Sequence, residues 1–185
     1  MKSMVAGTSK HTFTADEFLR LAELGFFGED ERVELLEGEI YHMSPTGPSH
    51  GAAVARLHER LLLALVGRVI LWNQSSVHLG ASMPEPDLAL LVPKADYYAS
   101  ANPEPGDILL VVEVAQTSLA YDRAKLAIYA RNDVPEVWIA DLNAELLEVY
   151  REPSAGTYKT SFALNFNEML SPLAFPEEAQ AWLGE

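Results

Sequence analysis

Glu113 is the residue whose type is least expected from its surroundings, because it lies within the apolar run Ile108–Ala115. The run is short and rich in β-branched residues, which is typical of a strand buried on both faces. An ionised carboxylate there costs free energy unless it is paired, hydrogen-bonded or bound to a metal ion. A second acid, Asp87, opens another apolar run, and Lys125 lies one short helix downstream of Glu113. Two strand carboxylates with a nearby lysine indicate a metal-dependent hydrolytic site.

Magnesium suits such a site, because it takes oxygen ligands, usually one or two carboxylates together with waters and substrate phosphates. Asp87 and Glu113 supply these carboxylates if their strands are neighbours in a sheet. Lys125 shares one stripe of its expected helix with Asp122 and Tyr129. We expect the other, apolar stripe to face the core, which would leave Lys125 at the edge of the core beside the Glu113 strand.

The elements that position these side chains follow from periodicity, capping signals and turn residues. The expected helices cover residues 14–25, 49–67, 119–131 and, as a short C-terminal helix, 176–183. The expected strands cover residues 69–72, 75–79, 87–92, 108–114, 137–140, 146–150 and 158–164, with a hairpin over 32–43. The order strand, helix, strand over 108–140 predicts a βαβ unit with parallel strands. The sequence therefore predicts an α/β fold with a mixed sheet and helices packed on it.

Length and composition set the class of protein. A chain of 185 residues, 49% of them apolar, is expected to form a single domain over 1–185, with 1–11 as a loose N-terminus. The absence of cysteine excludes disulfides, thiolate zinc sites and cysteine nucleophiles. The first ten residues lack the apolar core of a signal peptide, and no apolar segment approaches the roughly 20 residues that span a bilayer. We expect a cytoplasmic protein without a membrane partner.

The net charge of −14 argues against a protein that coats nucleic acid, which would need a basic surface. It does not exclude a nuclease, since an acidic cleft that holds metal ions is locally negative until the ions bind.

Several short segments also carry a resemblance to a known family. They are Glu34–Glu39, Ser44–Gly51, Pro86-Asp87, Glu113-Val114-Ala115, Lys125–Tyr129 and Val134–Asp141. In this order and spacing they resemble the Uma-type family of restriction-endonuclease-like domains, within the PD-(D/E)XK nuclease superfamily. The resemblance extends from about Phe13 to Tyr150.

The resemblance implies a restriction-endonuclease-like central mixed β-sheet flanked by helices, and metal-dependent phosphodiester hydrolysis. Asp87 matches the motif aspartate and Glu113 the second acid. Ala115 stands where the usual motif has its lysine, and Lys125 matches the version in which the lysine has moved to the next helix. Glu34 matches an acidic residue that precedes the motif and can join the metal shell.

A structural explanation stands beside each of these roles. Asp87 could cap a turn, and Glu34 could be a surface acid of the hairpin. Glu113 and Lys125 could form a buried salt bridge without any metal. His50, at a helix start, is expected to serve local capping or packing rather than chemistry.

The sequence leaves the roles of three other residues undecided. Arg56 and Arg60 share a helix face that could meet phosphate or face solvent. Gln116 stands where the family resemblance leads us to expect a small hydroxyl residue.

Three functional hypotheses follow. The first is a magnesium-dependent deoxyribonuclease acting on DNA, in which Mn²⁺ can substitute: Asp87 and Glu113, with Glu34, hold the metal, and Lys125 assists the attacking water. Cutting both strands of a duplex requires two copies of a single-site domain, so a homodimer or higher homo-oligomer is expected. The second is a non-catalytic binding or regulatory module that keeps the nuclease fold. The third is hydrolysis of a smaller phosphoester or nucleotide.

Overall fold

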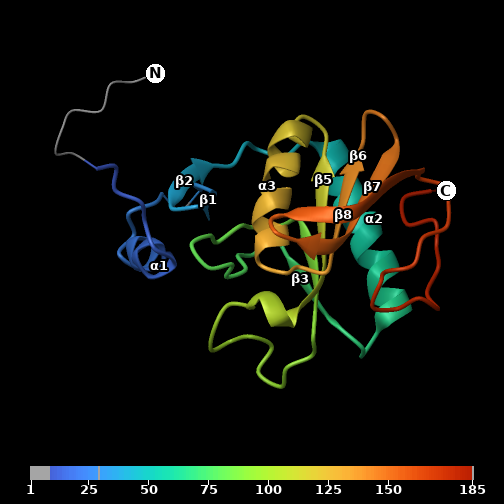
Figure 1. Ribbon diagram of the computed structural model, residues 1–185, viewed down its shortest axis with the longest axis horizontal. Coiled ribbons are helices and arrows are strands. Elements are labelled where there is room, and N and C mark those ends of the chain that lie inside the picture. Colours follow the sequence, from blue (N-terminus) through green and yellow to red (C-terminus); the bar gives the residue numbers. More distant parts are fainter. Residues whose placement is uncertain (1–8, 29, 185) are drawn as a thin grey trace.

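A six-stranded mixed sheet forms the centre of the computed structural model, which describes residues 9–28 and 30–184 (Figure 1). The loose terminus expected over 1–11 therefore lies mostly outside the described residues. The helices are α1 (Ala15–Glu23), α2 (Pro48–Leu65) and α3 (Leu119–Arg131), with a 3₁₀ turn η1 (Pro105–Asp107). The strands are β1 (Val33–Leu36), β2 (Glu39–His42), β3 (Ile70–Asn73), β4 (Leu88–Leu91), β5 (Ile108–Ala115), β6 (Glu136–Asp141), β7 (Leu146–Ser154) and β8 (Thr157–Asn165).

The strand order of the central sheet is β3-β4-β5-β6-β7-β8, and β1 and β2 pair separately. Among the described strands, β5 and β6 alone run parallel, and α3 connects them, so the predicted βαβ unit is confirmed. The pairs β3–β4, β4–β5, β6–β7 and β7–β8 are antiparallel. The expected mixed sheet flanked by helices is thus confirmed.

Helices cover both faces of the sheet (Figure 1). Leu57 and Leu61 of α2 share one apolar core with Val112 of β5. Tyr129 of α3 belongs to a second core with Val111. Because neighbouring residues of a strand point to opposite faces, the side chain of Glu113 lies on the α3 side. None of the described helices combines the length and apolar character that crossing a bilayer demands.

The N-terminal helix supports the small hairpin that carries Glu34. Thr14 and Glu17 form the predicted capping box of α1. Phe18 packs with Leu35 of β1 in a third apolar cluster. At the hairpin turn, Gly38 has φ +81°, and a Cβ there would lie 2.7 Å from that of Thr12. Glycine is therefore required where the hairpin meets the segment that leads into α1.

Two predicted elements are wrong. Residues 75–79 form no strand and contribute only an isolated bridge between Leu79 and Ser82. Residues 176–183 are not helical, because their backbone is tied to other elements instead. Arg60 of α2 donates to the carbonyl of Ala181, and the backbone of Gln180 forms an isolated bridge with that of Leu170, with both hydrogen bonds at 3.0 Å.

The start of α2 also differs from the prediction. Gly47 is the N-cap and Pro48 the first helical residue, so Ser49 lies inside the helix instead of capping it. Proline suits this first position, since its missing N–H is not needed there.

Candidate active site

Strand pairing brings Asp87 next to Glu113. Leu88, the first residue of β4, is paired with Val112 of β5, and continuing this antiparallel register by one residue sets Asp87 opposite Glu113. The backbone N–H of Val114 donates to Asp87 Oδ2 at 2.8 Å. The two acids predicted as metal ligands therefore lie at the same edge of the β4–β5 pair.

Lys125 meets Glu113 from the helix that follows β5. Its Nζ is 2.7 Å from Glu113 Oε1, and the hydroxyl of Tyr129 donates to the same oxygen at 2.6 Å. Lys125 is 2% exposed and Asp122 5%. The polar stripe of α3 thus faces the sheet, whereas Leu126 of the apolar stripe is only partly buried. Our expectation that Lys125 lies at the edge of the core is wrong, because its Nζ is buried within 3.9 Å of carboxylate oxygens of Glu113, Glu34 and Asp122.

Glu34 joins this cluster from β1. Its Oε1 accepts the hydroxyl of Tyr121 at 2.6 Å, and its Oε2 accepts the backbone N–H of Glu85 at 3.0 Å. The same Oε2 lies 3.7 Å from Lys125 Nζ. Glu34 is fully buried, so it is not a surface acid of the hairpin. Both of its oxygens already accept hydrogen bonds from the chain.

His50 is the site residue whose part the sequence analysis missed. Its Nε2 lies 3.0 Å from Asp87 Oδ2, and no described residue partners its buried Nδ1. Capping and packing do not account for this contact, which joins α2 to the edge of β4. The two residues are 37 positions apart in the sequence, and no local pattern signals such a pair.

The charged side chains of the cluster change one another's pKa values. Burial raises the pKa of Glu113 to about 8, and the carboxylates of Asp122 and Asp87 add to this effect, while Lys125 opposes it. Burial alone would lower the pKa of Lys125, but the carboxylates of Glu113, Glu34 and Asp122 raise it above its usual value. The result is a lysine that stays charged beside a carboxyl group that binds protons readily.

Asp87 behaves in the opposite way. Burial acts to raise its pKa, but the hydrogen bond and charge of His50 and the N–H of Val114 outweigh burial and lower the pKa. The hydrogen bond from Asp87 in turn raises the pKa of His50. Asp87 is therefore held as a carboxylate.

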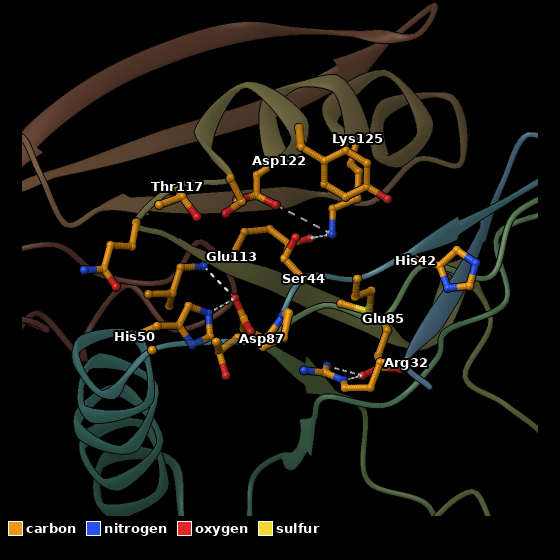
Figure 2. A pocket seen from close by; sticks show the side chains of 18 residues that line it. Arg32, His42, Ser44, His50, Glu85, Asp87, Glu113, Thr117, Asp122 and Lys125 are labelled. Carbon is orange, nitrogen blue, oxygen red and sulfur yellow. Dashed lines mark hydrogen bonds and ion pairs between the residues drawn. The ribbon is translucent and has the colours of Figure 1, made fainter. Parts of the chain in front are cut away.

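A cavity of about 330 Å³ opens onto this cluster (Figure 2). Asp87, Glu113 and Lys125 line it together with His50, Gln116 and the loop 43–47. Figure 2 shows the pair Arg32 and Glu85 at a separate part of its wall from Lys125. The cavity gives a ligand access to both acids.

Comparison with known proteins agrees with this arrangement. The Uma2 family, described as "Putative restriction endonuclease", matches residues 15–183. The chain belongs to the Uma2 family. A comparison with proteins of curated function gives no match.

The solved structures include a similar chain, described as a "putative nuclease belonging to DUF820" from Anabaena variabilis. The TM-score is 0.75 at 15% sequence identity, over 91% of this chain and 93% of that chain. At this identity the likeness shows the fold alone. Family and fold are therefore those that the sequence predicted.

The donor set of this Uma2-family chain fits one hard metal ion held by two carboxylates. Asp87 Oδ1 receives only a long contact, 3.4 Å from Gln74, and no hydrogen bond from the described residues reaches Glu113 Oε2. Within residues 9–28 and 30–184, no group of three or more His, Asp or Glu side chains is arranged to hold a metal ion. Two carboxylates suffice for magnesium, which usually keeps several waters.

Proposed function

We propose that this Uma2-family chain is a magnesium-dependent phosphodiester hydrolase that acts on nucleic acid, with DNA as the expected substrate. The observation that carries the proposal is the convergence of Asp87, Glu113 and Lys125 at one cavity, with Lys125 Nζ 2.7 Å from Glu113 Oε1. Asp87 and Glu113 are the proposed ligands of Mg²⁺, for which Mn²⁺ can substitute. Bound magnesium would polarise the phosphodiester and lower the pKa of an attacking water.

The chain's own residues have distinct roles in this proposal. Lys125 carries a fixed positive charge that orients the water and stabilises negative charge developing on the phosphate. His50 holds Asp87 in place through its Nε2 contact. Glu34 was predicted as a further metal ligand, but it is absent from the lining of the cavity, and each of its oxygens accepts a hydrogen bond from the chain. We therefore assign it to the positioning of Lys125.

Calorimetric titration with Mn²⁺ tests the metal site without requiring the right substrate. Mn²⁺ prefers the same oxygen ligands and generally binds more tightly than Mg²⁺. We expect saturable binding that is lost in Asp87→Asn and Glu113→Gln. Glu148→Gln is the matched control, because Glu148 pairs with Arg123 outside the cavity. A DNA cleavage assay with the same variants then tests hydrolysis.

One observation favours a second candidate, a non-catalytic module with the same fold. Glu113 Oε1 is satisfied by Lys125 and Tyr129 within the protein, so the pair is complete without a metal ion. Under this alternative, wild-type protein shows no heat of Mn²⁺ binding up to millimolar concentration. Binding that depends on both acids would rule the alternative out.

The expected homodimer belongs to the same proposal, because one copy provides one set of Asp87, Glu113 and Lys125. Duplex cleavage by one site per chain requires two copies. Sedimentation equilibrium on the purified protein measures this directly, and a monomer at all concentrations would remove the dimer from the proposal.

A further inference from the structure

The positive charges of the described residues are almost all neutralised within the chain. Twelve of the thirteen lysine and arginine residues are described, and nine of these lie at ion-pair distance from a carboxylate of the same chain. The exceptions are Arg56, Arg60 and Lys159. Arg56 and Arg60 donate to main-chain carbonyls of the C-terminal segment. Lys159 lies on β8, four strands away from β4 in the sheet order.

This distribution of charge disfavours duplex DNA. Non-specific affinity for a duplex comes from several lysines and arginines that neutralise phosphates and release counterions. Here a phosphate that approached a paired cation would also meet that cation's own carboxylate, within a chain of net charge −14. The described surface therefore lacks the basic stripe along which a duplex would lie.

The depth of the site also disfavours duplex DNA. The side chains of Lys125 and Glu113 are only 2% and 3% exposed, so a phosphodiester has to enter the cavity to reach them. The cavity volume of about 330 Å³ is at the lower end of the range of about 300–1,000 Å³ for small-molecule sites. A flexible strand can turn a single nucleotide into such a space, whereas the phosphates of a stiff duplex stay on its outer surface.

One cation at the cavity remains reachable. Arg32 lines the cavity and is paired with Glu85, but its side chain is 36% exposed and that of Glu85 only 14%, so a phosphate in the cavity can meet the guanidinium from the side away from the carboxylate. Arg32 can therefore contact the phosphate that neighbours, along the strand, the phosphate reacting at Asp87 and Glu113. With Lys125, about two cations would face the bound strand.

We infer that the substrate of this site is an unpaired nucleic-acid strand or a short oligonucleotide, with Arg32 contacting a phosphate beside the reacting one. The inference rests on the proposed function and specifies its substrate class.

Fluorescence anisotropy with labelled DNA tests the inference, with Ca²⁺ as the oxygen-liganded metal ion. The probes are a single strand of about six nucleotides, within the usual site sizes for unpaired strands, and a blunt duplex. We expect the single strand to bind at least about tenfold more tightly than the duplex. Raising salt from about 50 to 200 mM should weaken strand binding only about sevenfold, as two neutralised phosphates imply for a single strand.

Two cavity variants and a control test whether Arg32 contacts a phosphate of the bound strand. Arg32→Gln should weaken strand binding and lower the salt slope by about one contact. Glu85→Gln, which frees Arg32, should strengthen binding. Arg20→Gln should change neither quantity, because Arg20 pairs with Glu23 on α1 and does not line the cavity.

Equal or tighter binding of the blunt duplex, a salt loss of about 10³ or more as expected for six to ten contacts, or no binding of the strand would each overturn the inference. These results are distinct from failure of the proposed function, which is absence of Mn²⁺ binding at Asp87 and Glu113. Cleavage of the blunt duplex that is lost in Asp87→Asn would sustain the function and reject the substrate class.

Discussion

At the scale of single residues, Asp87 depends on a neighbour from a different element. The Nε2 of His50 on α2 lies 3.0 Å from Asp87 Oδ2, while the second oxygen of Asp87 has no short partner. A carboxylate held in this way presents its free oxygen in one direction. This is the role that residues behind a metal ligand generally play.

We predict that His50→Phe weakens Mn²⁺ binding about 10–100-fold, as is typical when a residue that orients a metal ligand is removed. His50→Gln, which keeps an N–H donor, should retain most of the affinity. His58→Phe is the matched control, because His58 also lies on α2 but contacts Asn73 instead. Calorimetry measures all three. Equal affinity in His50→Phe and wild type would show that Asp87 needs no support from α2.

The pair Glu113 and Lys125 is the second feature at this scale. We predict that Lys125→Met lowers the free energy of unfolding of the metal-free protein by about 3–5 kcal/mol, because it leaves buried carboxyl groups without their cation. Adding Glu113→Gln should recover part of the loss, with a coupling energy of about 0.5–3 kcal/mol. Urea denaturation measures the cycle.

An exposed lysine provides the control for that cycle. Lys94→Met removes the partner of Asp107 at the surface, where a salt bridge contributes at most about 1 kcal/mol. Equal losses in Lys125→Met and Lys94→Met would show that the buried charge of Lys125 is not compensated by the cluster around it.

How much of the site the sequence revealed depends on how local each signal is. Asp87, Glu113 and Lys125 could be singled out because charged residues stand out beside short apolar runs, and the structure brings the three together. The side of α3 that faces the sheet could not be found, since Lys125 and Tyr129 are buried against Glu113 and polarity does not reveal that. The partner of His50 was beyond reach because the contact is long-range.

At the scale of elements, β6 and β7 are tied to the C-terminal segment by one buried acid. Glu136, at the first position of β6, accepts the indole N–H of Trp138 at 2.9 Å and the Nε–H of Arg151 at 2.7 Å. Its other oxygen accepts the backbone N–H of Leu173 at 2.6 Å. Glu136 belongs to Val134–Asp141, one of the segments that carry the family resemblance, and its contacts there stabilise the fold.

We predict that Glu136→Ala lowers the free energy of unfolding by about 3–5 kcal/mol, because the charge of Arg151 and two further donors lose their acceptor. Mn²⁺ affinity of the folded protein should stay unchanged, since Glu136 does not line the cavity. Denaturation and calorimetry on the same sample measure both quantities. A loss of metal affinity would indicate that the far end of the sheet controls the geometry of Asp87 and Glu113.

The contrast between local signals and long-range contacts also explains which elements could be predicted. The strand predicted over 108–114, which is β5, and the helix predicted after Thr14 were correct because an apolar run and a capping box act locally. The strand over 75–79 was wrong, since β propensity does not supply the neighbour that a ladder needs. The helix over 176–183 was wrong because Arg60 and other distant groups bind its backbone.

At the scale of the whole molecule, the net charge of −14 affects the association of two copies of the chain as well as the choice of substrate. Two copies of so acidic a chain repel each other at low ionic strength. The predicted homodimer rests on duplex cleavage, whereas an unpaired strand needs only one cut and one site. The substrate inferred from the charges thus removes the reason for expecting a dimer.

Metal binding links the site to the stability of the entire fold. We predict that Mn²⁺ at about 100 times its dissociation constant adds about 2.7 kcal/mol by mass action, which corresponds to a rise in melting temperature of about 5–11 °C for a chain of this size. Calorimetric melting with and without Mn²⁺ measures the rise. Asp87→Asn should abolish it.

The pH dependence of this rise has a definite sign. Burial raises the pKa of Glu113 to about 8 in the metal-free protein, and a metal ion needs the ionised carboxylate. Well below this pKa each bound ion must displace a proton, so affinity falls by up to about tenfold per pH unit. At a fixed Mn²⁺ concentration, most of the rise seen at pH 8 should therefore be lost at pH 6. An equal rise at both pH values would mean that Glu113 is ionised throughout, and no rise at either would favour the non-catalytic module.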